Sequence, residues 1–122
     1  MIGSLLYATA SRPDVLHAVG LVGRYQAAPK ENHLLAVKMI FRYLKGTIDF
    51  GLWYPKGNKL TLLAYTEADW AGDIDDKKST SRGGFFLGEC LVDWLSRKQS
   101  LVSLSTTEAE YISTGACCTQ IL

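Results

Sequence analysis

The sequence predicts an α+β fold, or a related α/β fold, in which two helices precede a strand meander and a final helix. Apolar residues recur at helical spacing as far as residue 45, and beyond Gly46 they form short runs that are typical of strands. A last helical segment begins near residue 105 and continues to Leu122. With 122 residues, 48% of them hydrophobic, the chain suits one small domain or part of one with an attached segment.

The first two predicted helices form a hairpin. Arg12-Pro13-Asp14 is typical of a helix start, because proline is tolerated at the first helical position and aspartate favours the positive helix end. This helix is expected to reach Ala27. Pro29-Lys30-Glu31 starts a second helix in the same way, and that helix runs to Lys45 with Gly46 as its stop. Its predicted apolar face consists of Leu34, Val37, Phe41 and Leu44.

A basic stripe lies on another face of the second helix. Lys38, Arg42 and Lys45 follow one another at positions i, i+4 and i+7. Residues 1–60 carry eight basic and three acidic side chains, a charge of +5, whereas residues 61–122 carry five basic and nine acidic ones, a charge of −4. The split indicates two parts with different partners. The stripe is either solvated surface or a face that contacts phosphates.

Four strands are expected after Gly46. Alternating or apolar runs at residues 50–54, 60–66, 84–87 and 92–95 predict them. Residues 55–58 have the composition of a turn, and the polar residues 71–82 have that of a loop. A short extended segment follows at residues 102–104.

The last helix opens with a capping box. The Ser105 hydroxyl is expected to accept a hydrogen bond from the Glu108 amide, while the Glu108 carboxylate reaches back to the start of the helix. Its inward face is predicted to hold Ala109, Ile112 and Ala116. A sheet of neighbouring hairpins backed by this one helix can bury one face, and the helix that ends with the chain suggests that the next strand is missing.

Five carboxylates crowd into ten positions: Glu67, Asp69, Asp73, Asp75 and Asp76. Glu67 and Asp69 are two residues apart at the end of a strand, so their side chains point the same way. Glu110 lies on the helix that is expected to cover the sheet. Carboxylates gathered in this way repel one another unless cations lie among them, and magnesium prefers such oxygen ligands. For Asp73, Asp75 and Asp76 we expect a solvated acidic loop.

Cysteine usage and hydropathy indicate the compartment. Cys90, Cys117 and Cys118 are odd in number and lack zinc-ligand spacing, so we interpret them as reduced and intracellular. The apolar start lacks a positively charged leader region, and no run approaches the roughly 20 apolar residues that span a bilayer. We therefore expect an intracellular protein, in the cytoplasm or the nucleus, that is neither secreted nor in a membrane.

Several motifs, in a constant order, resemble one family. Residues 65–72 (YTEADWAG), 78–81 (KSTS), 94–99 (WLSRKQ), and Ser105 with 108–111 (EAEY) resemble the ribonuclease H domain of Ty1/copia retroelements. Upstream, residues 3–10, 12–14 and 42–47 resemble the segment that follows the reverse transcriptase palm of that family. The resemblance covers nearly the whole chain. It implies a helical connection segment at 1–48 and the N-terminal part of a ribonuclease H-like domain at 49–122. That part would hold an incomplete mixed sheet, namely a three-strand meander and the first helix.

The resemblance implies a specific chemistry. The family domain cuts the RNA strand of RNA–DNA hybrids with two Mg²⁺ (or Mn²⁺) ions, which carboxylates hold. Its first-strand aspartate falls on Glu67 and its helix glutamate on Glu110, and Asp69 is the remaining nearby carboxylate. These three residues are the predicted catalytic and metal-binding site, in a degenerate form.

The sequence departs from the family pattern at several positions, and two of the departures, Glu67 and a missing third carboxylate, predict an inactive nuclease. Glu67 replaces an aspartate and is longer by one methylene, about 1 Å where roughly half an ångström is tolerated. Arg82 stands where the family usually has glycine. The family's third carboxylate belongs to a strand after the helix that carries Glu110, and the sequence does not include it.

Three functions remain open. The first is a remnant module that binds RNA–DNA hybrid or other nucleic acid weakly through Lys38, Arg42 and Lys45, together with Arg97 and Lys98, and that also contacts the rest of a Pol polyprotein. The second is an exapted or effector-labelled protein-interaction module, since residues 42–45 (RYLK) resemble the Arg-x-Leu-Arg motif of oomycete effectors. The third is an intact nuclease whose remaining strands lie outside this chain.

Overall fold

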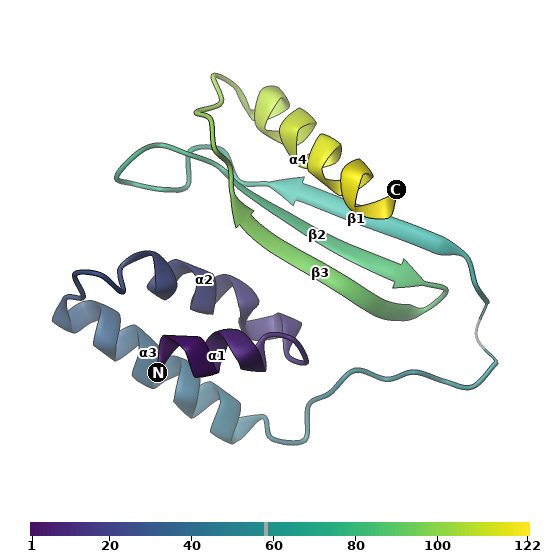
Figure 1. Ribbon diagram of the computed structural model, residues 1–122, viewed down its shortest axis with the longest axis horizontal. Helices are drawn as coiled ribbons and strands as arrows, with labels where there is room; N and C mark the ends of the chain where they lie inside the picture. Colours follow the sequence, from purple (N-terminus) through teal and green to yellow (C-terminus); the bar gives the residue numbers. More distant parts are fainter. Residues whose placement is uncertain (58) are drawn as a thin grey trace. The chain divides into compact units, whose positions relative to one another are not determined.

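Helices precede the strands along the chain and a last helix follows them, which confirms the predicted α+β order (Figure 1). The computed structural model describes residues 1–57 and 59–122. The chain forms two units, Met1–Trp53 and Tyr54–Leu122. The resemblance had placed a boundary between residues 48 and 49. Asn58, at the end of the predicted turn, lies outside the described residues.

The first unit is helical throughout its regular part. It contains α1 (Ile2–Ala8), a short 3₁₀ turn η1 (Pro13–Val15), α2 (Leu16–Arg24) and α3 (Glu31–Gly46). The first predicted helix does begin at Pro13, as η1, and the second does end at Gly46, as α3. Helix α1 was not predicted, because its apolar residues have no polar face that would mark it as a surface helix.

An apolar core holds these helices together. It consists of buried side chains from α1, η1, α2 and α3, namely Leu5, Val15, Val19, Val22, Val37 and Ile40. The predicted inner face of α3 was partly wrong, since Leu34 and Phe41 are 43% and 44% exposed. Apolar residues surround α3 on more than one side, so the hydrophobic pattern alone did not select the buried face.

Arg12 fastens the start of η1 to the end of α3. Its Nη1 donates to the Thr47 carbonyl oxygen at 3.1 Å, and its Nη2 donates to Thr47 Oγ1 at 2.7 Å. The guanidinium also donates to both carboxylate oxygens of Asp14. This hydrogen bonding lowers the pKa of Asp14. The Arg-Pro-Asp motif therefore organises the helical unit as well as starting a helix.

The second unit is a three-stranded antiparallel sheet backed by a helix. Its strands are β1 (Leu62–Ala68), β2 (Thr80–Leu87) and β3 (Cys90–Lys98), in the order β1-β2-β3. All pairing among the described residues is antiparallel, which confirms the three-strand meander that the resemblance implied as the part of a mixed sheet present here. The strand predicted at residues 50–54 was wrong: these residues form no strand, although their aromatic and apolar composition is typical of one.

Helix α4 (Thr106–Ile121) packs against β1 and β2 and covers one face of the sheet (Figure 1). Its buried residues are Ala109, Ser113 and Cys117, at intervals of four. The prediction of Ala109 is confirmed, but Ala116 is exposed. Polar Ser113 and thiol-bearing Cys117 do not register as an apolar stripe, which explains the error.

The predicted cap of α4 is confirmed. Ser105 Oγ accepts a hydrogen bond from the Glu108 amide at 3.1 Å. The Glu108 carboxylate does reach back, but it accepts from the amide of Leu104 at 2.6 Å, one residue before the cap. The cap therefore fixes both the start of the helix and the direction in which the chain enters it.

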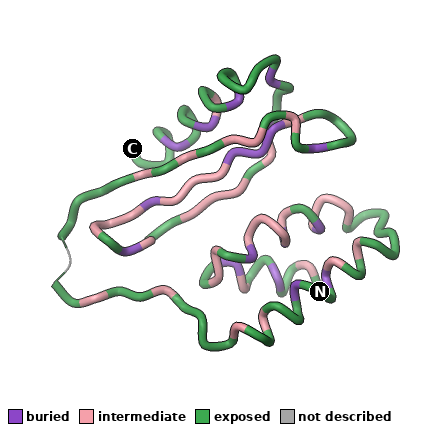
Figure 2. The backbone as a smooth tube through the Cα atoms, turned by 180° about the vertical axis from the view of Figure 1, so that it is seen from behind, coloured by how far each residue is buried: buried purple, intermediate pink, exposed green. Residues whose placement is uncertain are grey.

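Many of the buried side chains of the second unit are polar and hydrogen-bonded. Figure 2 marks the buried positions along the backbone in purple. Gln99 is 6% exposed, and its Nε2 donates to Ser81 Oγ at 3.0 Å and to the Ala109 carbonyl oxygen at 2.9 Å. Its Oε1 accepts from Ser103 Oγ at 3.0 Å. The Ser103 carbonyl in turn accepts from Trp70 Nε1 at 3.1 Å. The family-like motifs thus meet in one internal network.

Candidate functional site

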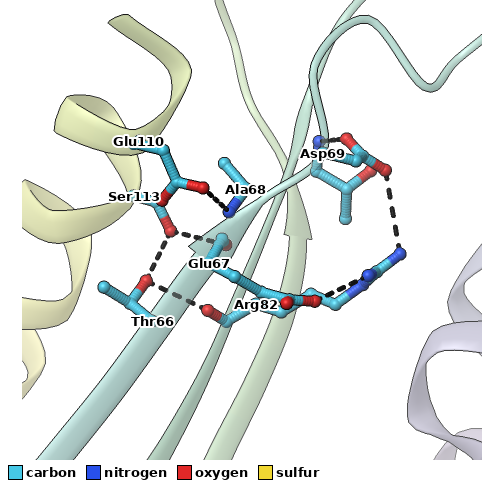
Figure 3. A network of polar contacts seen from close by, with 8 residues as sticks. Thr66, Glu67, Ala68, Asp69, Arg82, Glu110 and Ser113 are labelled. Carbon is cyan, nitrogen blue, oxygen red and sulfur yellow. Dashed lines mark hydrogen bonds and ion pairs between the residues drawn. The ribbon is translucent and has the colours of Figure 1, made fainter. Parts of the chain in front are cut away.

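The predicted carboxylates lie around the C-terminal end of β1 (Figure 3). Thr66 faces α4, because its Oγ1 lies 2.5 Å from Ser113 Oγ. Successive side chains of a strand point to opposite faces, so Glu67 points away from α4, as Figure 3 shows. Glu110 lies on α4 itself. The structure therefore turns the first two predicted metal ligands, Glu67 and Glu110, in different directions.

Arg82 pairs with Glu67 across the sheet. The two residues are direct partners in the antiparallel register of β1 and β2. Arg82 Nη1 donates to Glu67 Oε1 at 2.8 Å, and the two side chains are 36% and 64% exposed. Opposite charges in directly opposed strand positions stabilise the pairing. The Arg82 guanidinium thus fixes where the Glu67 carboxylate points.

Asp69 is held by backbone and by the same arginine. Its Oδ1 accepts a hydrogen bond from the Thr80 amide, and its Oδ2 lies 3.8 Å from Arg82 Nη2. The carboxylate also rests on Gly72, where an added Cβ would come within 2.6 Å of Asp69 Oδ2. Asp69 therefore lies against the turn that follows β1, and a side chain at position 72 would displace its carboxylate.

Glu110 has a separate partner. Its Oε1 accepts a hydrogen bond from the Ala68 amide at 3.1 Å, which ties α4 to the end of β1. Within the described residues, no group of three or more His, Cys, Asp or Glu side chains is arranged to hold a metal ion. Glu67, Asp69 and Glu110 do not fit a two-metal centre, because each carboxylate accepts a hydrogen bond from a protein donor and the Glu67 side chain points away from the helix that carries Glu110.

The acidic loop is not wholly solvated, which corrects our expectation for Asp73. This residue is 7% exposed, and its Oδ2 lies 2.7 Å from Lys98 Nζ, which also lies 2.8 Å from Asp76 Oδ2. Hydrogen bonding from Lys98 lowers the pKa of Asp73 well below its ordinary value, and the two carboxylates raise the pKa of Lys98. Asp75, by contrast, is exposed as predicted.

The predicted nucleic-acid-binding residues fall into two groups. Lys38, Arg42 and Lys45 are exposed on α3, and Arg97 is exposed on β3. Lys98 differs, because its charge is matched within the chain by Asp73 and Asp76. None of the helices in the described part of the chain is long and apolar enough to cross a membrane.

The role of Arg82 was missed at the level of sequence. The sequence did show an arginine where the resemblance implies glycine, but it did not show that this side chain reaches Glu67 and Asp69. That contact depends on the register of β1 and β2, which pairs residues 15 positions apart. Only the predicted strand boundaries could have signalled it, and β2 begins at Thr80, within residues expected to be a loop.

Comparison with known proteins finds retrotransposon polyproteins. Over 113 residues, the chain is 47% identical to the retrovirus-related Pol polyprotein from transposon RE1 of Arabidopsis thaliana and to that from transposon TNT 1-94 of Nicotiana tabacum. These matches cover 93% and 92% of the chain but 8% of each relative. The secreted RxLR effector protein 161 of Plasmopara viticola is 38% identical over 92% of the chain and 80% of its own length. No protein-family model and no solved structure matches.

Proposed function

This chain belongs to the family of Ty1/copia-type retrotransposon Pol polyproteins, and we propose that its second unit is a ribonuclease H-like module that does not cut RNA–DNA hybrids. The observation that carries the proposal is the divergence of Glu67 and Glu110. Glu67 is drawn to Arg82 on the open face of the sheet, while Glu110 binds the Ala68 amide.

Hydrolysis of a phosphodiester by two metal ions requires converging carboxylates. The ions lie about 3.5–4 Å apart and stabilise the attacking and leaving oxygens together. A carboxylate that is paired with a guanidinium belongs to a pair without net charge, so it attracts a metal ion less strongly than a free carboxylate does. Glu67 is also longer than the aspartate that the resemblance implies at this position. Both features lower the capacity of the carboxylates beside Arg82, Glu67 and Asp69, to hold ions in catalytic geometry. We call this group of three residues at the end of β1 the corner.

A cleavage assay tests the proposal directly. The full chain is incubated with an RNA–DNA duplex labelled on the RNA strand, in Mg²⁺ and separately in Mn²⁺. We expect cleavage at the rate of the protein-free control, and a catalytically active ribonuclease H in parallel confirms that the substrate can be cut. Metal-dependent cleavage by this chain that is lost in Glu110→Gln would overturn the proposal.

We also propose that α3 contacts nucleic-acid phosphates weakly. Lys38, Arg42 and Lys45 are exposed along a single helix, which suits an extended line of phosphates. Binding should weaken as salt rises. The slope of the logarithm of the binding constant against the logarithm of the salt concentration should become smaller by about one unit for each phosphate contact that is lost.

Filter binding of an RNA–DNA duplex at several salt concentrations measures this slope. The triple variant Lys38→Gln, Arg42→Gln, Lys45→Gln should bind more weakly and with a slope smaller by about three units. Lys56→Gln, which removes an exposed charge outside α3, is the control. An unchanged slope in the triple variant excludes α3 as the binding face.

A second candidate is a protein-interaction module without enzymatic activity. The observation that favours it is the similarity to a relative named as a secreted effector, 80% of which the chain matches. Under this alternative the protein is secreted and its first residues are removed. Fractionation of the producing cells with mass spectrometry of the mature N-terminus distinguishes the two: an intact intracellular protein supports the first proposal.

A further inference from the structure

Arg82 occupies a particular position among the acidic residues of the second unit. Its guanidinium lies between two carboxylates, with Nη1 2.8 Å from Glu67 Oε1 and Nη2 3.8 Å from Asp69 Oδ2. Figure 3 shows the side chain crossing from β2 towards both. We infer that Arg82 is a built-in cation, which stands in for a divalent metal ion at this corner and keeps such ions out. The inference rests on the proposed function, since that function implies a metal at this place.

The chemistry of arginine suits this role. A guanidinium is always charged, and its planar set of donors can serve two carboxylates at once. A divalent ion between the same carboxylates would meet the guanidinium charge at close range. The two cations therefore compete for one set of oxygens, and the one that is covalently part of the chain is always present.

Exclusion by charge, rather than by burial, follows from the openness of the site. A shallow cavity of about 290 Å³ is lined by Glu67, Arg82 and their neighbours Tyr65, Thr66, Gly83 and Gly84. Glu67 is 64% exposed, and Asp69 is 29% exposed. A hydrated ion can therefore reach these carboxylates, so among the described residues it is the local charge, and not burial, that keeps the ion away.

The charge balance makes a definite prediction. Glu67 and Asp69 contribute −2 and Arg82 contributes +1, so the corner carries −1 with the arginine and −2 without it. Lys98 does not compensate here, because Asp73 and Asp76 already engage it. Removal of the Arg82 charge should strengthen the attraction for a divalent ion.

Titration of the full chain with Mn²⁺, followed by the loss of the free-ion electron paramagnetic resonance signal, tests the inference. Wild type is expected to show no saturable site at this corner. Arg82→Gln should gain a saturable Mn²⁺ site, roughly tenfold or more tighter than any Mn²⁺ binding that the titration detects in wild type, as one positive charge within about 4 Å is removed. Arg97→Gln removes the same charge from an exposed position on β3 and should leave Mn²⁺ binding unchanged.

The double variant Arg82→Gln, Glu67→Gln identifies the ligands. It should lose the affinity that the single variant gained, because one of the two carboxylates is gone. Equal Mn²⁺ affinity in wild type and Arg82→Gln overturns the inference, and so does a gain that survives in the double variant. Circular dichroism verifies that each variant is folded.

A measurement on the unaltered protein keeps the test valid even if Arg82→Gln fails to fold. Paramagnetic broadening of nuclear magnetic resonance signals by Mn²⁺ reports which residues lie near the ion. Selective broadening at Glu67 and Asp69 in wild type contradicts the inference, and its absence supports it. These readouts are independent of cleavage: an active wild type would refute the proposed function, whereas metal binding alone decides the role of Arg82.

Discussion

The two units of this chain are stabilised by different interactions. The interior of the first is apolar, built from side chains such as Leu5, Val19 and Ile40. The interior of the second includes buried Ser79, Thr80, Ser81, Gln99, Ser103 and Ser113. Burial of apolar surface is non-directional, whereas a buried hydrogen bond requires its partner in the correct place. At buried positions, the second unit should therefore be less tolerant than the first of substitutions that keep the volume of the side chain but remove its hydrogen-bonding groups.

The largest effect is expected from Leu5→Ala. Leu5 is 2% exposed in the apolar core, and such truncations cost about 2–5 kcal/mol through lost burial and a remaining cavity. Urea unfolding measures the loss, and hydrogen exchange of the α2 and α3 amides should show where it falls. The neighbouring Leu6→Ala, at a position that is 47% exposed, is the matched control and should change stability little. Equal losses in both variants would refute the assigned core.

Gln99→Leu tests the contrast between an apolar and a hydrogen-bonded interior. It replaces a buried amide by an apolar side chain of similar size, a change that an apolar interior would accommodate. Here it removes the partners of Ser81, Ser103 and the Ala109 carbonyl. Since each unsatisfied buried group costs about 1–3 kcal/mol, we expect a net loss of about 3 kcal/mol in urea unfolding. The control is Gln26→Leu, at an exposed position. A gain in stability from Gln99→Leu would contradict the contrast.

The smallest effect concerns pH. Hydrogen bonding from Lys98 lowers the pKa of Asp73 in the folded protein, so this group stabilises the fold above its unfolded pKa of about 4. The contribution is lost as pH falls through the lower pKa of the folded state. Asp73→Asn should therefore be less stable than wild type at pH 7, and the difference should shrink below about pH 4. Urea midpoints across pH 2–8 check this. A difference that is constant over this range would exclude the Lys98 pair as its cause.

The same contrast explains which features could be predicted from sequence. Helix α3 was placed well, because glycine punctuation and amphipathic spacing are local signals. The start of β2 was missed, because Thr80 and Ser81 are buried through hydrogen bonds and read as loop residues. The three candidate carboxylates were located by resemblance. Their actual partners could not be, since Arg82 meets Glu67 only through strand register.

The register that pairs Glu67 with Arg82 also couples the effects of changes at the two positions. Glu67→Asp alone would shorten the carboxylate and withdraw it from a guanidinium that remains in place. Arg82→Gly alone would leave two close carboxylates without their cation. Each single change thus removes a contact before the other can compensate for it. The effects of changes at these two positions, 15 residues apart in the sequence, should therefore be non-additive.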